Sequence, residues 1–106
     1  MAKYLFHASY SPEGLKGLQK DKASGRLAAV RQIAESVGGK LECMYYALGE
    51  DDVVIIADLP DNVAASAISL TVSAAGLVRT RTTALMTIEE TDKALAMNVG
   101  YRKPGG

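Results

Sequence analysis

The sequence lacks most of the residues from which common metal and cofactor sites are built. It has no tryptophan, one cysteine and one histidine among 106 residues. An internal disulfide and the usual zinc sites are therefore excluded. The 12 basic residues are matched by 12 acidic ones, so no net charge draws the chain to nucleic acid or to an anionic membrane. We expect no metal, no cofactor, no nucleic-acid partner and no membrane partner.

Long hydrophobic runs are also missing. The longest uncharged stretch, residues 62–78, contains five hydroxyl or amide side chains and is shorter than the ~20 apolar residues of a membrane span. Lys3 is followed by an apolar run that His7 and Ser9 interrupt, so no secretory leader is expected. With 48% hydrophobic and 23% charged residues, the composition is typical of a soluble domain. We expect one cytoplasmic domain over residues 1–106, with a frayed tail over 99–106.

Periodicity and capping residues predict seven elements. Alternating apolar residues indicate strands over residues 3–10, 41–48, 52–59 and 77–86. Ser11-Pro12-Glu13 begins a helix that ends near Gly38-Gly39, and Asp61 begins another that ends at Gly76. The segment 21–25 is polar and contains a glycine, which leaves open whether the first of these helices is one piece or two. Thr87-Ile88-Glu89-Glu90 forms a capping box for a short helix through about Met97.

The element order β-α-β-β-α-β predicts an α+β, ferredoxin-like fold with an added C-terminal helix. Right-handed crossovers then place both long helices on one face of a four-stranded antiparallel sheet. Strands 3–10 and 52–59 are central, and strand 77–86 lies beside strand 3–10. We call the sheet face without helices the open face.

The strand over residues 52–59 is apolar on both of its faces. Val53 and Ile55 alternate with Val54 and Ile56, whereas a strand with one wet face alternates with polar residues. Leaving Val54 and Ile56 in water forgoes roughly 1.5–3 kcal/mol of burial for each side chain. We therefore expect a second copy to cover the open face, in a homodimer or a higher even-numbered oligomer. The alternative cover is the C-terminal helix, folded back over the same chain.

Strand alternation assigns the remaining side chains to faces. On the open face we place Leu5, His7, Ser9, Glu42, Met44, Tyr46, Asp52, Val54, Ile56, Asp58, Arg79, Arg81 and Thr83; of these, Leu5, Met44, Val54 and Ile56 are the candidates for the oligomer interface. On the helix side we place Tyr4, Phe6, Ala8, Cys43, Tyr45, Val78, Ala84 and Met86. In the second helix, the buried stripe is predicted at Val63, Ala67, Leu70 or Thr71, and Ala74.

Several short motifs resemble those of the GYD-domain proteins, a family of small bacterial proteins. The similarity runs from about Lys3 to Glu90, with markers at Tyr10-Ser11-Pro12-Glu13-Gly14, Gly38-Gly39-Lys40, Asp52-Val53-Val54, Leu59-Pro60-Asp61 and Gly76-Leu77-Val78-Arg79-Thr80. In the signature that names the family, Gly49 and Asp52 match the glycine and aspartate, and Asp51 stands at the tyrosine position. The resemblance implies a ferredoxin-like fold and oligomers of the dimeric α+β barrel kind, but no particular activity.

His7, Arg79 and Arg81 form the best candidate site, because adjacent strands bring them to one face. Two arginines can hold a carboxylate or phosphate, and histidine titrates near neutral pH. Tyr46 and Asp58 complete the predicted ligand-binding set. The alternative is that both arginines form ion pairs with Glu42, Asp52 or Asp58 across a subunit interface.

Other chemistry has weaker support. His7 alone could ligate a haem iron, but the sequence offers no second ligand and a structural histidine is favoured. Cys43 reads as a buried thiol rather than a nucleophile. Glu50, Asp51 and Asp52 are more typical of a solvated hairpin tip than of a cation site. The strand over residues 52–59 has no aromatic residue, which counts against RNA binding through base stacking.

Two classes of function remain open. In the first, an anionic or aromatic small ligand occupies a cavity by the sheet, with apolar walls from Tyr4, Phe6, Tyr45 and Met86 and with His7 or an arginine as the polar group. In the second, the protein is a non-enzymatic oligomeric regulatory or assembly module. The fold hosts both, so topology does not choose between them; whether the protein is an enzyme stays open.

Overall fold

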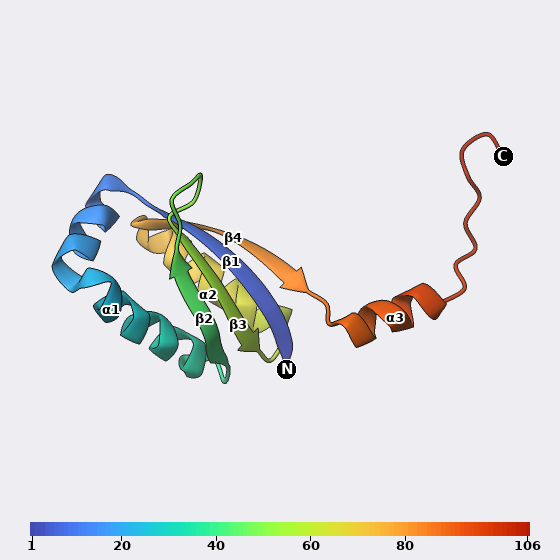
Figure 1. Ribbon diagram of the computed structural model, residues 1–106, viewed down its shortest axis with the longest axis horizontal. Coiled ribbons are helices and arrows are strands. Elements are labelled where there is room, and N and C mark those ends of the chain that lie inside the picture. The colour runs from blue at the N-terminus through green and yellow to red at the C-terminus, as the bar shows by residue number, and fades with distance from the viewer.

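The computed structural model describes all 106 residues, and the elements follow the predicted order (Figure 1). They are β1 (Ala2–Tyr10), α1 (Pro12–Ser36), β2 (Lys40–Tyr46), β3 (Val53–Leu59), α2 (Asn62–Ala75), β4 (Val78–Leu85) and α3 (Ile88–Ala96). The four strands form one antiparallel sheet in the order β2-β3-β1-β4. This confirms the ferredoxin-like α+β fold, with β1 and β3 central and β4 beside β1. None of the three helices combines the length and the hydrophobicity that a membrane span requires.

The capping residues act as the sequence predicts. The Ser11 hydroxyl accepts from the Gly14 N–H, with Pro12 in the first turn, and the Asp61 carboxylate accepts from the Ala64 N–H at 3.0 Å. Gly76 ends α2 in the left-handed region, at φ 77°, which glycine adopts without steric cost. Within α1, Lys22 leaves helical geometry at φ 64°, so the helix is kinked inside the polar segment 21–25.

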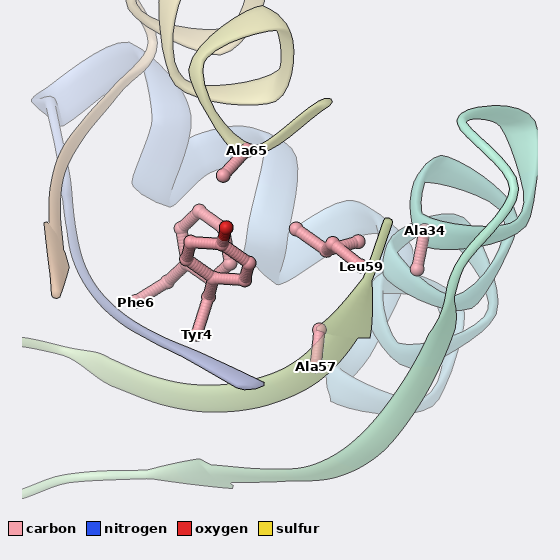
Figure 2. Close-up of a cluster of buried hydrophobic side chains, with 6 residues drawn as sticks. All are labelled: Tyr4, Phe6, Ala34, Ala57, Leu59 and Ala65. Carbon is pink, nitrogen blue, oxygen red and sulfur yellow. The ribbon is translucent and has the colours of Figure 1, made fainter. Parts of the chain in front are cut away.

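The core lies between the sheet and the two long helices. Its buried cluster consists of Tyr4 and Phe6 of β1, Ala57 and Leu59 of β3, and Ala34 and Ala65 of the helices (Figure 2). Leu5, His7 and Ser9 are half-buried on the opposite, open face, and their β4 partners Thr83, Arg81 and Arg79 share that face. The predicted faces of β1, β3 and β4 are therefore confirmed.

The predicted faces of β2 are wrong beyond Glu42. The pairing with β3 shifts by one residue between Leu41 and Cys43, as in a β-bulge, where two residues of one strand oppose one of the other. After the shift, Cys43 and Tyr45 pair with Ile56 and Val54 on the open face. Met44 and Tyr46 instead pair with Ile55 and Val53 and face the helices. Met44 is thus no longer a candidate for an open-face interface.

The buried stripe of α2 is also not the predicted one. The side toward the sheet consists of Ala64, Ala65, Ile68 and Val72, whereas Val63, Ala67, Leu70, Thr71 and Ala74 are exposed. Ala65 is 3% exposed and lies in the cluster with Tyr4, whose hydroxyl donates to Asn62 Oδ1 at 2.6 Å. The small Ala65 side chain lets the helix approach the ring closely, and the larger Val63 and Leu70 turn outward.

The C-terminal helix does not return over the sheet. The Thr87 capping box forms as predicted, but α3 lies beyond the end of β4, away from α1, α2 and the body of the sheet (Figure 1). Met86, predicted in the core, is 58% exposed at the start of this extension. The alternative in which α3 covers the open face of its own chain is therefore wrong, and Val54 and Ile56 stay half-buried without a cover.

Candidate functional site

One end of the open face gathers three of the predicted site residues. His7 pairs with Arg81 across β1 and β4, and Ser9 pairs with Arg79. Asp51, in the loop between β2 and β3, accepts hydrogen bonds from the Ser9 hydroxyl at 3.0 Å and from the Arg81 guanidinium. The structure thus brings His7, Arg79 and Arg81 to one face, with a carboxylate beside them that the sequence did not assign to the site.

The Asp51 carboxylate forms an ion pair with the guanidinium of Arg81, which the sequence predicts to bind a ligand. Arg81 lowers the pKa of Asp51 below its usual range through this hydrogen bond, with the Ser9 hydroxyl as a further donor, and Asp51 raises the pKa of Arg81 in return. Asp52 accepts from the Tyr10 N–H at 2.8 Å. The Arg81 ion pair is therefore made within the chain, with Asp51 rather than with Glu42, Asp52 or Asp58.

Asp58 lies at the other end of the open face. It pairs with Lys3 across β3 and β1, and the Lys3 ammonium donates to Asp58 at 2.8 Å and to Glu42. These two carboxylates raise the pKa of Lys3. Lys3 and His7 are four residues apart on one strand, roughly 13 Å at ~3.3 Å per residue, so Asp58 does not join the His7 group.

Tyr46 lies on the opposite face from His7 because of the bulge in β2. Its hydroxyl is 3.1 Å from the hydroxyl of Tyr10, and burial together with this hydrogen bond raises the pKa of Tyr46. Of the five predicted ligand-binding residues, the structure groups His7, Arg79 and Arg81 and separates Tyr46 and Asp58 from them.

A cavity of about 70 Å³ lies on the helix side, between α1, α2 and the sheet. This volume is several times the ~10–15 Å³ that one water requires. Fourteen of its 16 lining residues are hydrophobic, among them Phe6, Val30, Met44 and Ile68. The other two are Arg26 of α1 and Thr80 of β4. The hydroxyl of Tyr10, which also lines the cavity, is already paired with that of Tyr46.

One atom of Arg26 and one atom of Thr80 are buried without a hydrogen-bond partner. Only three buried side-chain nitrogen or oxygen atoms in the protein have no partner: Arg26 Nε, Thr80 Oγ1 and His7 Nδ1. Two of the three therefore line the same cavity, whereas buried polar groups are satisfied in the large majority of cases. Arg26 also takes part in none of the ion pairs in the structure.

An open groove of about 310 Å³ between α1 and α2 adjoins this cavity. Tyr10, Arg26, Val72 and Val78 line both spaces, so Arg26 stands where they meet. The outer part of the groove includes Glu13 and Asp21. The cavity and the groove therefore adjoin each other at Arg26.

Comparison with known proteins identifies the family. The family model described as GYD domain matches residues 4–95 of the 106. The chain belongs to the GYD-domain family. No curated protein and no solved structure matches it.

In this GYD domain, the loop that carries the signature residues ties the hairpin to β1. Asp51 binds Ser9 and Arg81, and Asp52 binds the backbone of Tyr10 while its own N–H donates to Ala8. Asp51 and Asp52 therefore accept hydrogen bonds from β1 and β4. Across the GYD domain, no group of three or more His, Cys, Asp or Glu side chains is placed to hold a metal ion.

Sequence reasoning found only part of the cavity in the GYD domain. Of the predicted walls, Phe6 lines it, Tyr4 lies in the core cluster, Tyr45 is exposed on the open face, and Met86 is exposed past β4. Arg26 was missed as the polar group. A signal existed: Arg26 is four residues before Val30 and eight before Ala34, which places a charge on the buried stripe of the helix.

Proposed function

We propose that this GYD protein is a small, homo-oligomeric, cytoplasmic bacterial protein that binds a compact carboxylate with an apolar body in the cavity between the helices and the sheet. The observation that carries this proposal is the pair of unpartnered donors, Arg26 Nε and Thr80 Oγ1, in an otherwise apolar cavity. Catalysis is not part of the proposal.

A carboxylate satisfies both groups at once. A buried donor without an acceptor costs about 1–3 kcal/mol, and more when it is charged. A carboxylate accepts from several donors, and its hydrogen bonds to a guanidinium are among the strongest in proteins. An alcohol leaves the guanidinium charge unpaired, and an amine adds a second cation beside it. The chemistry therefore favours an anion at the polar end and a short hydrocarbon chain or small ring beyond it.

The anion site lies on the helix side because the open face has a carboxylate already. Arg81 is paired with Asp51, and Lys3 with Asp58 and Glu42. The helix side offers no acidic residue among the 16 that line the cavity. A ligand carboxylate meets no competing acid inside the cavity, although Glu13 and Asp21 stand in the outer groove.

Titration with hexanoate, 1-hexanol and hexylamine tests the site, with the melting temperature and calorimetric binding as readouts. We expect hexanoate to bind and to raise the melting temperature, and the alcohol and amine to have much weaker effects. Arg26→Gln should weaken hexanoate binding by roughly 10–100-fold, as expected for a lost charge-assisted hydrogen bond, and Thr80→Val by less. The matched control is Arg31→Gln, an exposed arginine on the same helix, which should bind as the parent does.

Two results would overturn the ligand proposal. One is equal stabilisation by hexanol and hexanoate, because the guanidinium then plays no part. The other is no binding of hexanoate, benzoate or octanoate, which favours the second class, an assembly module without a ligand. Either result leaves the oligomer proposal to be judged separately.

The homo-oligomer rests on the open face. Leu5, Val54 and Ile56 form an apolar centre between the two ion-pair groups, and no segment of the same chain covers it. A second copy that covers these side chains would remove apolar surface from water. It would not need to supply acidic partners for Arg81 or Lys3, because both are already paired within the chain. Light scattering on Ile56→Asp should show dissociation of this contact. Thr83→Asp, at an exposed position of the same face, is the control and should change assembly less. A parent protein that is monomeric at micromolar concentration contradicts this part.

A further inference from the structure

Helix α2 is the least polar surface element of the molecule. Its 14 residues include no charged side chain, yet only Ala65 is buried. A helix that is apolar or uncharged on all sides is normally covered on most of them. On its outer side Val63 is 76% exposed and Leu70 is 71% exposed. Neither the core nor the cavity described above uses this side.

A groove of about 530 Å³ runs beside this outer surface, between α2 and β4. Its nine lining residues include Tyr4, Ser66, Leu70 and Ala84, and none of them is charged. Strand β4 is at the edge of the sheet, so nothing of the same chain lies farther out. We call the groove together with Val63 and Ala67 the α2 surface.

Helix α3 carries a matching apolar side. Ile88, Thr91, Ala94 and Leu95 fall on one side of the helix, whereas Glu89, Glu90, Asp92 and Lys93 fall on the other. Ile88 is 82% exposed and Leu95 is 77% exposed, and the apolar Met97, Val99 and Tyr101 follow, also exposed. The structure shows α3 apart from every other element (Figure 1). Its apolar side therefore has no partner within the chain.

We infer that α3 docks on the α2 surface of a second copy of this chain, and that two copies exchange their C-terminal helices in this way. Exchange by a two-fold axis uses each surface once on each copy, so the contact closes and does not propagate. This interface is separate from the open face, because α2 and the open face lie on opposite sides of the sheet.

The length of α3 and the apolar area it exposes match those of the α2 surface. The exposed stripe from Val63 to Ala74 on α2 rises about 16 Å at 1.5 Å per residue, and the nine residues of α3 rise about 13 Å. One aliphatic side chain buries roughly 60–120 Å², given ~25 cal/mol per Å² and ~1.5–3 kcal/mol per side chain. Seven large apolar side chains are exposed on α2, on α3 and just after it: Val63, Leu70, Ile88, Leu95, Met97, Val99 and Tyr101. Together they supply roughly 420–840 Å² per copy, a range that reaches the ~800 Å² per partner of a stable interface.

Docking of α3 on its own α2 requires a different junction. Only Met86 separates the last residue of β4 from Thr87, the capping residue of α3, and Thr87 is extended at ψ 164°. The chain must reverse over these two residues to bring α3 back along β4. In the structure the junction instead continues outward, away from α2 and the sheet (Figure 1).

Cross-linking of single-cysteine variants tests the exchange in the full chain. Cys43→Ser is the background, with Ser66→Cys on the α2 surface in one variant and Thr91→Cys on the apolar side of α3 in another; the large apolar side chains stay intact. After mixing and treatment with a short bismaleimide, we expect cross-linked dimers that contain one copy of each variant. Dimers of the Ser66→Cys variant alone would show α2 packed on α2, and an intramolecular link in a chain carrying both substitutions would show α3 folded back; each overturns the exchange.

Substitution on α3 gives an independent measurement. Leu95→Asp should raise the dissociation constant of the exchanged contact at least 10-fold, measured by sedimentation. Ala96→Asp places the same charge near Glu89 and Asp92, on the polar side of the helix, and should leave the constant within about twofold of the parent. Unchanged assembly in Leu95→Asp overturns the inference. Ile56→Asp reports on the open face alone, so failure of one interface is distinguishable from failure of the other.

Discussion

The two faces of the sheet are incomplete in opposite ways. The helix side holds the most buried side chains, with Leu59 fully buried and Val53 at 1% exposure, but it leaves two donors without acceptors. The open face has ion pairs at both ends, but its apolar centre has no cover. The helix side thus lacks an acceptor for Arg26, and the open face lacks a surface that covers Val54 and Ile56. The difference shows why a small ligand suits one face and a second copy suits the other.

The largest expected effect is a difference in unfolding free energy between substitutions on the two faces of the sheet. Leu59→Ala removes a fully buried side chain and should lower the free energy of unfolding by about 3 kcal/mol, through lost burial and the cavity left behind. Ile56→Ala on the open face should cost about 1 kcal/mol in the dissociated monomer, because its side chain is only half-buried there. Urea unfolding at low protein concentration measures both. Equal losses would contradict the claim that the core lies on one side only.

The second effect sharpens the contrast between Arg26 and Arg81. Arg26→Met removes a buried donor that has no partner and should raise the free energy of unfolding of the ligand-free protein by about 1 kcal/mol. Arg31→Met, on the exposed side of α1, should stay within about 0.5 kcal/mol of the parent. Chemical denaturation of both variants without added carboxylate is the measurement. A destabilised Arg26→Met variant would mean that the guanidinium is already satisfied.

The smallest effect concerns pH at the open face. Arg81 lowers the folded pKa of Asp51, so this carboxylate stabilises the fold at pH values above its unfolded pKa of about 3.9. The contribution is lost as the pH falls from there through the lower folded pKa. In Arg81→Gln the pKa of Asp51 should rise toward its usual range, as carboxyl NMR titration would show. An unchanged titration in the variant would argue that Ser9 alone holds the carboxylate.

The element order and capping sites could be predicted because local chemistry decides them. Ser11, Asp61 and Thr87 each accept from the backbone N–H three residues ahead, and Gly76 ends α2 where a left-handed residue is needed. The faces of β1, β3 and β4 could be assigned because successive side chains of a regular strand point to opposite faces of the sheet. These features depend on neighbours in the sequence, so one chain is enough to find them.

The errors have a common origin in contacts that are distant in sequence. The pairing of β2 with β3 shifts at Glu42, and no local residue signals that bulge. The rotation of α2 follows from the contact of Ala65 with Tyr4, and the apolar Val63 and Leu70 gave a stronger periodic signal than the small residues that are buried. Arg26 was not assigned to the site because it lies one helical turn from Lys22, and basic residues at that spacing usually form a solvated helix face.

The irregular pairing at Glu42 has one more consequence. By turning Cys43 outward beside Ile56, it puts the only sulfhydryl of the protein on the surface that we assign to self-association. Dilution that separates the copies would unmask this group, and assembly would shield it from alkylating reagents. Because of the β-bulge, the rate at which Cys43 is alkylated would report whether the copies are associated.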